Sequence, residues 1–152
     1  MRPEFVERKL QLIAEELGRL AELADISYED LVGDPIRLAA VERMLERIVL
    51  RAVDANEHII SSLATGAEGK ATRLTYRETF LKLADYDVCS PEFAERIAAS
   101  AGLRNVLVHE YNDIDHRIVH GSIRRTLEDY TEYVSALMRF VDLGEWKGPS
   151  RP

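Results

Sequence analysis

The chain has 152 residues, of which 46% are apolar and 31% are charged, and this balance is typical of one folded domain. The single cysteine, Cys89, excludes an intrachain disulfide, and no apolar run approaches the roughly 20 residues of a membrane span. The formal net charge of −7 argues against a broad phosphate-binding surface, so a nucleic-acid site is expected only in a local cleft. We therefore expect a cytoplasmic protein without membrane contact.

The spacing of apolar residues predicts a first helix over residues 3–24. Its apolar positions recur at alternating steps of four and three, which places them on one stripe. They are Val6, Leu10, Ile13, Leu17, Leu20 and Ala24. The stripe fits an ordinary core face and also fits a subunit interface, because steps of three and four suit packing between helices.

A second, longer helix is predicted from Pro35 to about Leu63. Asp34 is a typical N-cap residue, and a proline is favoured at the first helical position. Gly66 is a plausible terminator, and residues 65–74 are expected to form a surface loop because they contain two glycines and mixed charges.

Two further sequence patterns typical of helix starts follow the loop. Thr75 and Glu78 form a capping-box pattern that predicts a short helix through about Ala84. Ser90 and Pro91 predict the start of a helix that continues to about Tyr111.

The last helix is predicted over residues 117–142. Its inward-facing residues are expected to be Ile118, Ile123, Leu127, Tyr130, Val134, Leu137 and Val141. The pattern indicates an all-α, up-and-down bundle of four to five helices, with residues 1–145 as one domain and 146–152 as a flexible tail.

Two polar groupings have simple structural explanations. His116 and His120 stand four residues apart, as zinc ligands can, but further ligands are too few, so we expect no metal. Asp54 and His58 share one face of the second helix. They fit a solvated helix edge, and they also fit a supporting polar notch that faces another helix.

The segment RNVLVHEYNDID, residues 104–115, carries the strongest chemical signal. Arg104, Asn105, His109 and Tyr111 span about half the circumference of a helix, and Arg104 and His109 are about 140° apart. One straight helix would not direct both side chains at one atom. The set fits a capped amphipathic helix end. It also fits a functional site, in which a bend or a second copy of the chain brings two such sets together.

The order TYRETF, SPEFAERIA and GLRNVLVHEYNDID resembles the HepT toxins of the HEPN superfamily of helical domains. VERMLERIVLRAVDANEHII resembles the second helix of that family, so the likeness covers roughly residues 35–140. The motif of the family is an Arg, a polar residue, an apolar spacer, a His and then a Tyr. Leu103 departs from the pattern, because the family often has an aromatic residue there.

The resemblance implies a homodimeric, metal-independent endoribonuclease without a cofactor, the toxin of a type VII toxin–antitoxin system. It implies phosphate binding by Arg104, acid/base chemistry by His109 and substrate positioning by Asn105. The expected product is a 2′,3′-cyclic phosphate, and the two Arg/His sets are expected to face one another across a cleft. The implied partners are the RNA substrate and a minimal nucleotidyltransferase (MntA-like) antitoxin, which silences the toxin by adenylylation (AMPylation) of Tyr111.

Two other functions stay open at this point. One is a non-catalytic nucleotide-binding or scaffolding partner of a nucleotidyltransferase, which the acidic net charge favours slightly. The other is a structural helical dimer, which leaves the polar set of residues 104–111 without a role. A scaffold needs neither Arg104 nor His109, so their joint presence favours the nuclease.

Overall fold

Helices form the regular structure of the chain. The computed structural model describes residues 1–64, 73–109 and 115–143, and for residues 104–106, 108 and 109 it describes the backbone alone. Within these residues there is no strand, and the predicted all-α bundle is confirmed. The helices are α1 (Pro3–Ala21), α2 (Tyr28–Val32), α3 (Pro35–Leu63), α4 (Tyr76–Asp85), α5 (Pro91–Ala98), α6 (Ser100–His109) and α7 (His116–Asp142).

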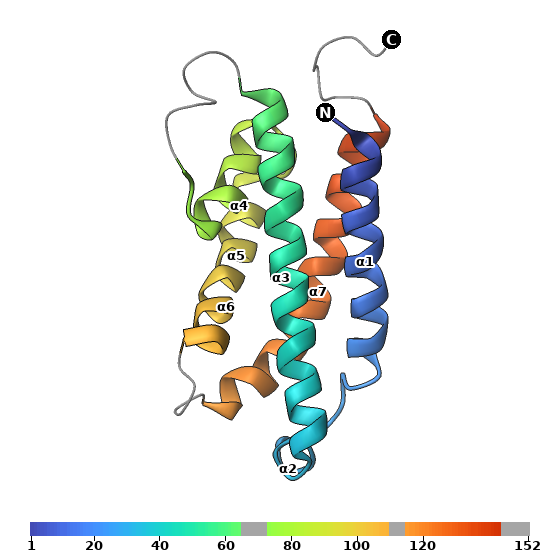
Figure 1. The fold of residues 1–152 in the computed structure, drawn as a ribbon, viewed down its shortest axis with the longest axis vertical. Coiled ribbons are helices and arrows are strands. Elements are labelled where there is room, and N and C mark those ends of the chain that lie inside the picture. Colours follow the sequence, from blue (N-terminus) through green and yellow to red (C-terminus); the bar gives the residue numbers. More distant parts are fainter. Residues whose placement is uncertain (65–72, 110–114, 144–152) are drawn as a thin grey trace.

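The long helix α3 is the axis around which the other helices pack. Figure 1 shows α1 and α7 along one side of α3, and α4, α5 and α6 along the other side. Helix α7 also packs against α1 and α5, so it connects the two sides of the bundle. The short helix α2 lies at the end of the molecule where α3 begins.

The predicted helix starts are confirmed by side-chain caps. Asp34 Oδ1 accepts a hydrogen bond from the backbone N–H of Arg37 at 3.1 Å. Thr75 and Glu78 form the reciprocal capping box, with distances of 3.2 and 3.0 Å. Ser90 Oγ accepts from the Phe93 N–H at 3.1 Å. Each cap depends on residues within one turn, which is why the sequence alone predicts it.

Two features of the helix order differ from the prediction. The short helix α2 was not predicted, although Ser27 caps it by accepting from the Asp30 N–H at 3.1 Å. The helix predicted from Pro91 to about Tyr111 is divided into α5 and α6 at Ala99. The Ser100 hydroxyl donates to the Ile97 carbonyl oxygen at 2.7 Å, and side-chain bonds of this kind bend helices.

The core follows most of the predicted stripes, with one clear correction on α7. Ile118, which was expected to face inward, is 46% exposed, whereas its neighbour Val119 is fully buried. A shift of one residue turns a helical side chain by about 100°, so α7 enters the bundle on a slightly different face. The expectations for Gly66 and for the tail 146–152 lie outside the described residues.

A buried polar cluster joins α3, α4 and α7. The Tyr133 hydroxyl donates its one proton to Asn56 Oδ1 at 2.6 Å and shares it with the Ala52 carbonyl oxygen at 3.1 Å. Asn56 Nδ2 donates to Thr79 Oγ1 at 3.2 Å, and the Thr79 hydroxyl donates to the Tyr76 carbonyl oxygen at 2.7 Å. Asn56, Thr79 and Tyr133 are fully buried. Partnered groups of this kind favour one alignment of the three helices, because another alignment would leave them without partners.

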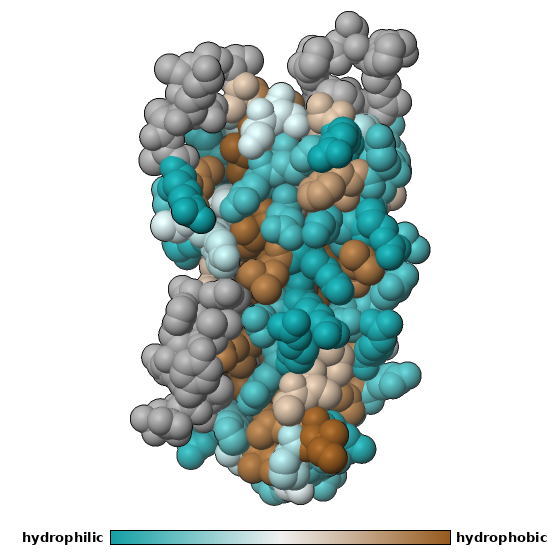
Figure 2. Space-filling model, viewed as in Figure 1, coloured by the Kyte–Doolittle hydropathy of each residue, from teal (hydrophilic) through white to brown (hydrophobic). Residues whose placement is uncertain are grey.

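The surface over α1 and α3 is mostly hydrophilic, and its apolar patches are separated by polar side chains (Figure 2). Among the described helices, none is long and apolar enough to cross a membrane.

Candidate functional site

Helix α6 contains the first three residues of the sequence motif. Its ten residues, Ser100–His109, include Arg104, Asn105 and His109. The predictions for these three side chains, and for Tyr111, lie outside what the structure describes. The described residues of α6 and its neighbours define how this helix is held.

The first turn of α6 is fixed to α7 through Ser100. Ser100 Oγ lies 2.7 Å from the Tyr130 hydroxyl, and Tyr130 is almost completely buried. Leu103 and Leu107, one turn apart, are partly buried against the core. The described residues therefore place one face of α6 against the bundle.

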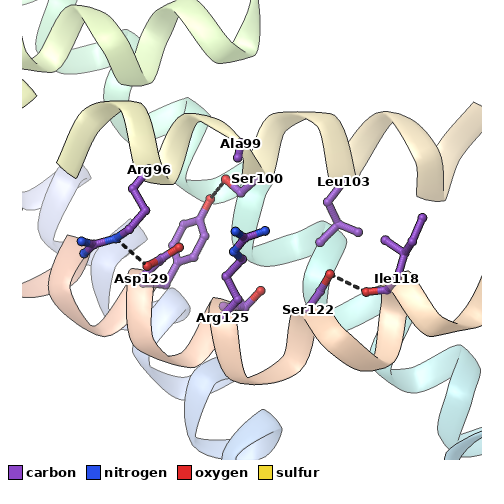
Figure 3. A pocket seen from close by; sticks show the side chains of 10 residues that line it. Arg96, Ala99, Ser100, Leu103, Ile118, Ser122, Arg125 and Asp129 are labelled. Atoms are coloured by element: carbon purple, nitrogen blue, oxygen red, sulfur yellow. Dashed lines mark hydrogen bonds and ion pairs between the residues drawn. The ribbon is translucent and has the colours of Figure 1, made fainter. Parts of the chain in front are cut away.

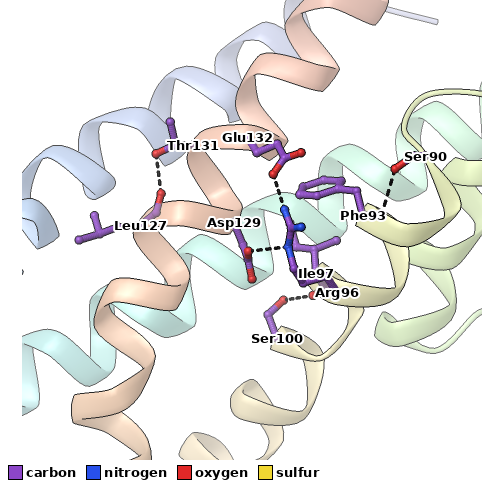
Figure 4. Close-up of polar contacts among 9 residues, drawn as sticks. All are labelled: Ser90, Phe93, Arg96, Ile97, Ser100, Leu127, Asp129, Thr131 and Glu132. Carbon is purple, nitrogen blue, oxygen red and sulfur yellow. Dashed lines mark hydrogen bonds and ion pairs between the residues drawn. The ribbon is translucent and has the colours of Figure 1, made fainter.

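A second attachment lies one turn earlier, between α5 and α7 (Figure 4). Arg96 Nε donates to Asp129 Oδ1 at 3.0 Å, and its Nη2 donates to Glu132. The Arg96 guanidinium also lies 5.1 Å from the centroid of the Phe93 ring, a cation–π distance. Its two carboxylate partners raise the pKa of Arg96. The charge of Arg96 is thus already paired within the fold.

A pocket of about 170 Å³ lies between the α5–α6 segment and α7 (Figure 3). Its polar groups come from Ser100, Ser122, Arg125, Asp129 and Tyr130 among others, and its apolar groups include Leu103 and Ile118. Leu103 directly precedes Arg104 on α6. The pocket is therefore next to the helix that carries the motif, and helical periodicity alone did not reveal it.

Asp54 and His58 lie on the other side of α3, where their side chains contact residues from the beginning of the chain. Asp54 Oδ2 accepts from Lys9 Nζ at 3.0 Å, and His58 Nε2 accepts from the Arg2 N–H at 3.0 Å. The Phe5 and His58 rings are 4.7 Å apart. The side chains of Asp54 and His58 therefore contact the N-terminal segment and α1.

The surroundings of His58 favour its neutral form. Partial burial, followed by the positive charge of Arg2, lowers the pKa of His58. A neutral ring nitrogen is needed to accept the Arg2 N–H, so the hydrogen bond and the lowered pKa agree.

In the pair His116 and His120, it is His120 that has a structural role. His120 Nε2 lies 2.7 Å from the Ile26 carbonyl oxygen, and its ring packs edge-on against Tyr28. Among the residues that the structure describes, no three His, Cys, Asp or Glu side chains gather into a metal-binding group.

Comparison with known proteins identifies close relatives over most of the chain. A family model described as Ribonuclease HepT-like matches residues 5–137. The chain is 37% identical over 139 residues to the tRNA nuclease HepT of Aphanizomenon flos-aquae (strain 2012/KM1/D3), and the match covers 91% of each protein. It is 24% identical over 93 residues to the mRNA nuclease HepT of Shewanella oneidensis, which covers 61% of this chain and 66% of that protein.

Solved structures share the fold at lower identity. A tri-AMPylated HEPN toxin of Shewanella oneidensis, solved in complex with MNT antitoxin, superposes with a TM-score of 0.73 at 20% identity, covering 89% of this chain and 97% of that one. The cytosolic protein YutE of Bacillus subtilis, of unknown function, gives a TM-score of 0.74 at 15% identity, covering 99% and 96%. At these identities the likeness is one of fold.

Proposed function

The chain belongs to the HepT-like ribonuclease family, and on that basis we propose that it is the endoribonuclease toxin of a type VII toxin–antitoxin system. The observation that carries the proposal is the Arg-x4-His-x-Tyr motif, residues 104–111, in a chain that matches the family over residues 5–137. The tRNA nuclease HepT, which matches over 91% of both chains, supports RNA as the substrate.

The chemistry follows from the residue types. RNA carries its own nucleophile, the 2′-hydroxyl, and a histidine whose pKa is near 6.5 can accept its proton at neutral pH. In the proposed reaction His109 removes this proton, and the 2′-oxygen attacks the adjacent phosphorus atom. The P–O5′ bond breaks, the leaving oxygen receives a proton, and a 2′,3′-cyclic phosphate remains. No metal ion or cofactor is required for these steps.

Arg104 and Asn105 have supporting roles in this proposal. A guanidinium keeps its charge at every relevant pH and can hold two phosphate oxygens, so Arg104 stabilises the charge that develops on the phosphate. Asn105 orients the substrate or His109. A homodimer would place two Arg/His sets across one cleft, with one histidine as base and the other as acid.

Control by a partner is the second part of the proposal. A minimal nucleotidyltransferase antitoxin transfers AMP from ATP to the Tyr111 hydroxyl and releases pyrophosphate. Each AMP adds bulk and negative charge close to the motif, which opposes the binding of an RNA phosphate. The fold match to an AMPylated HEPN toxin in complex with MNT antitoxin supports this partner.

Cleavage in the presence of EDTA tests the nuclease. The purified chain should cut RNA to products with 2′,3′-cyclic phosphate ends, and Arg104→Ala and His109→Ala should each abolish the cut while circular dichroism stays unchanged. A chain that cuts no RNA but still binds the nucleotidyltransferase would favour the non-catalytic scaffold.

Peptide mass spectrometry tests the control. Incubation with the antitoxin and ATP should add about 329 Da per AMP to the peptide that contains Tyr111. The other tyrosines, Tyr28, Tyr76, Tyr86, Tyr130 and Tyr133, serve as internal controls. Tyr111→Phe should remain an active nuclease in the presence of the antitoxin, and silencing of this variant would refute the assignment.

A further inference from the structure

The pocket between the α5–α6 segment and α7 contains an arginine, Arg125, that has no polar partner among the residues that the structure describes. Figure 3 shows Arg125 extending from α7 toward α6, with Ser100 on one side and Leu103 on the other. No hydrogen bond or ion pair joins Arg125 to another described residue. The other arginines around it differ: Arg96 is paired with two carboxylates, and Arg124, the neighbour of Arg125 on α7, is paired with Asp25.

Because the carboxylates near the pocket are paired with Arg96, the charge of Arg125 makes the pocket locally positive in a chain whose net charge is negative. Asp129, the carboxylate in the pocket wall, already accepts from Arg96 at 3.0 Å. Arg125 is an exposed residue, and its guanidinium keeps its charge at every relevant pH. Its planar N–H groups suit the oxygens of a phosphate. An anion is therefore the ligand that this charge would attract.

The remaining wall of the pocket suits the other parts of a nucleotide. Leu103 and Ile118 provide an apolar surface, and Ile118 is 46% exposed although it is a large aliphatic side chain. The Ser122 hydroxyl donates to the Ile118 carbonyl oxygen at 2.6 Å, which leaves its oxygen as an acceptor for a base or ribose. A volume of about 170 Å³ is below the ~300–1,000 Å³ of sites for drug-sized ligands, so it suits one nucleotide unit at most.

The pocket lies next to the helix that carries Arg104 of the motif, and this position points to RNA as its ligand. Its wall includes Leu103, and the next residue on the same helix is Arg104 of the motif. An RNA strand bound at the motif helix therefore has a neighbouring nucleotide within reach of the pocket. Single-stranded RNA exposes its bases for such contacts, and its phosphates are available to a single arginine.

We propose that the α6–α7 pocket binds one nucleotide of the RNA substrate next to the scissile bond, with the phosphate on Arg125 and the base against Leu103 and Ile118. This inference rests on the proposed nuclease function and adds a binding residue outside the motif. Arg125 acts in substrate binding, so its loss should change affinity and KM more than kcat.

Binding of a fluorescently labelled single-stranded RNA tests the pocket in the His109→Ala background, in which the RNA stays intact. Adding Arg125→Ala should weaken the affinity by about tenfold, the typical size of one hydrogen-bonded charge contact. It should also lower the slope of log K against log salt by about 0.7, the value for one phosphate of a single strand. Arg124→Ala is the matched control, since it removes the same charge from the adjacent residue; its effect should stay below about twofold.

The outcomes separate this inference from the proposed function. If the native chain cuts RNA and Arg104→Ala does not, the proposed function stands. In that case the proposed role of the pocket alone would be overturned if Arg125→Ala bound RNA as tightly as its parent, or if Arg125→Ala and Arg124→Ala lost equal affinity for RNA. A native chain that neither binds nor cuts RNA overturns both.

Ile118→Asp provides a second test of the same surface. A carboxylate at the rim of the pocket should weaken RNA binding by at least as much as Arg125→Ala, because it repels the phosphate. The oligomeric state, measured by light scattering, should not change. Conversion of a dimer to a monomer by Ile118→Asp would assign this surface to self-association and overturn the inference.

Discussion

The buried hydroxyl of Tyr133 offers the sharpest test of how this bundle is held together. Tyr133→Phe removes the hydroxyl that donates to Asn56 Oδ1 at 2.6 Å and shares its proton with the Ala52 carbonyl oxygen at 3.1 Å. Asn56 is fully buried, so its side-chain oxygen loses the Tyr133 donor at a place where solvent cannot replace it. An unsatisfied buried acceptor costs about 1–3 kcal/mol, and we expect a loss of about 2 kcal/mol.

Tyr130→Phe is the matched control. Its hydroxyl lies 2.7 Å from Ser100 Oγ, but Ser100 still donates to the Ile97 carbonyl oxygen after the change. No buried group is left without a partner, so the expected loss is about 0.5–1.5 kcal/mol, the net value of one ordinary hydrogen bond. The two variants remove the same atom from two adjacent, buried tyrosines.

Urea and thermal unfolding, followed by circular dichroism at one protein concentration, measure the difference. At about 2–4 °C per kcal/mol for a chain of this size, Tyr133→Phe should lower Tm by roughly 4–8 °C. A double-mutant cycle with Asn56→Ala should show a coupling of at least ~0.5 kcal/mol. Equal losses for the two tyrosines, or a loss below about 0.5 kcal/mol for Tyr133→Phe, would refute the reasoning.

Three further expectations concern other buried or partly buried groups. Because the pKa of His58 is lowered in the folded chain, the unfolded chain binds more protons below about pH 6.5, and the free energy of unfolding falls as the pH drops through that range. Urea unfolding measured from pH 8 to 5 should therefore depend less on pH for His58→Gln than for the native chain. Burial, together with the charge of Glu132, raises the pKa of Cys89 to about 11. Iodoacetamide should therefore alkylate the thiol of the native chain at pH 8 much more slowly than the thiol of the chain unfolded in urea, and equal rates would contradict this. Glu16 is 1% exposed, and its carboxylate oxygens lie 2.6 Å from Arg19 Nη1 and 3.5 Å from Arg47 Nη1. The double variant Arg19→Ala/Arg47→Ala leaves this buried charge unpaired and should lower the free energy of unfolding in urea by about 3 kcal/mol, most of which Glu16→Leu should restore.

The helices that could be predicted from the sequence are those whose ends depend on nearby residues. Asp34, Thr75 and Ser90 each cap a helix by accepting from a backbone N–H three residues away, so a short window contains the whole signal. The division at Ala99 was missed because Ser100 is also held by Tyr130, thirty residues later in the chain. A contact of that range has no signature in periodicity.

The candidate site shows the same difference between local and distant information. The motif residues on α6 were identified by resemblance, because their order along the chain is the signal. The significance of Arg125 depends on what lies around it: Arg124 and Arg125 are identical in sequence terms, yet one is paired with Asp25 and the other extends into the pocket. Asp54 and His58 were correctly placed on one helix face, but only the structure reveals their contacts with Lys9 and Arg2.

The shortness of α6 has a consequence for how occupancy of the site can be observed. The ten described residues of α6 are fewer than the ~12–15 at which isolated helices become marginally stable in water, so their order depends on packing against α3, α4 and α5 and on the contact of Ser100 with Tyr130 of α7. Any ligand that contacts only the folded form of α6 must shift its opening equilibrium by RT ln(1 + [L]/Kd). Amide hydrogen exchange along residues 100–109 therefore measures ligand binding, because the protection of these amides rises with the bound fraction even when no RNA is cleaved.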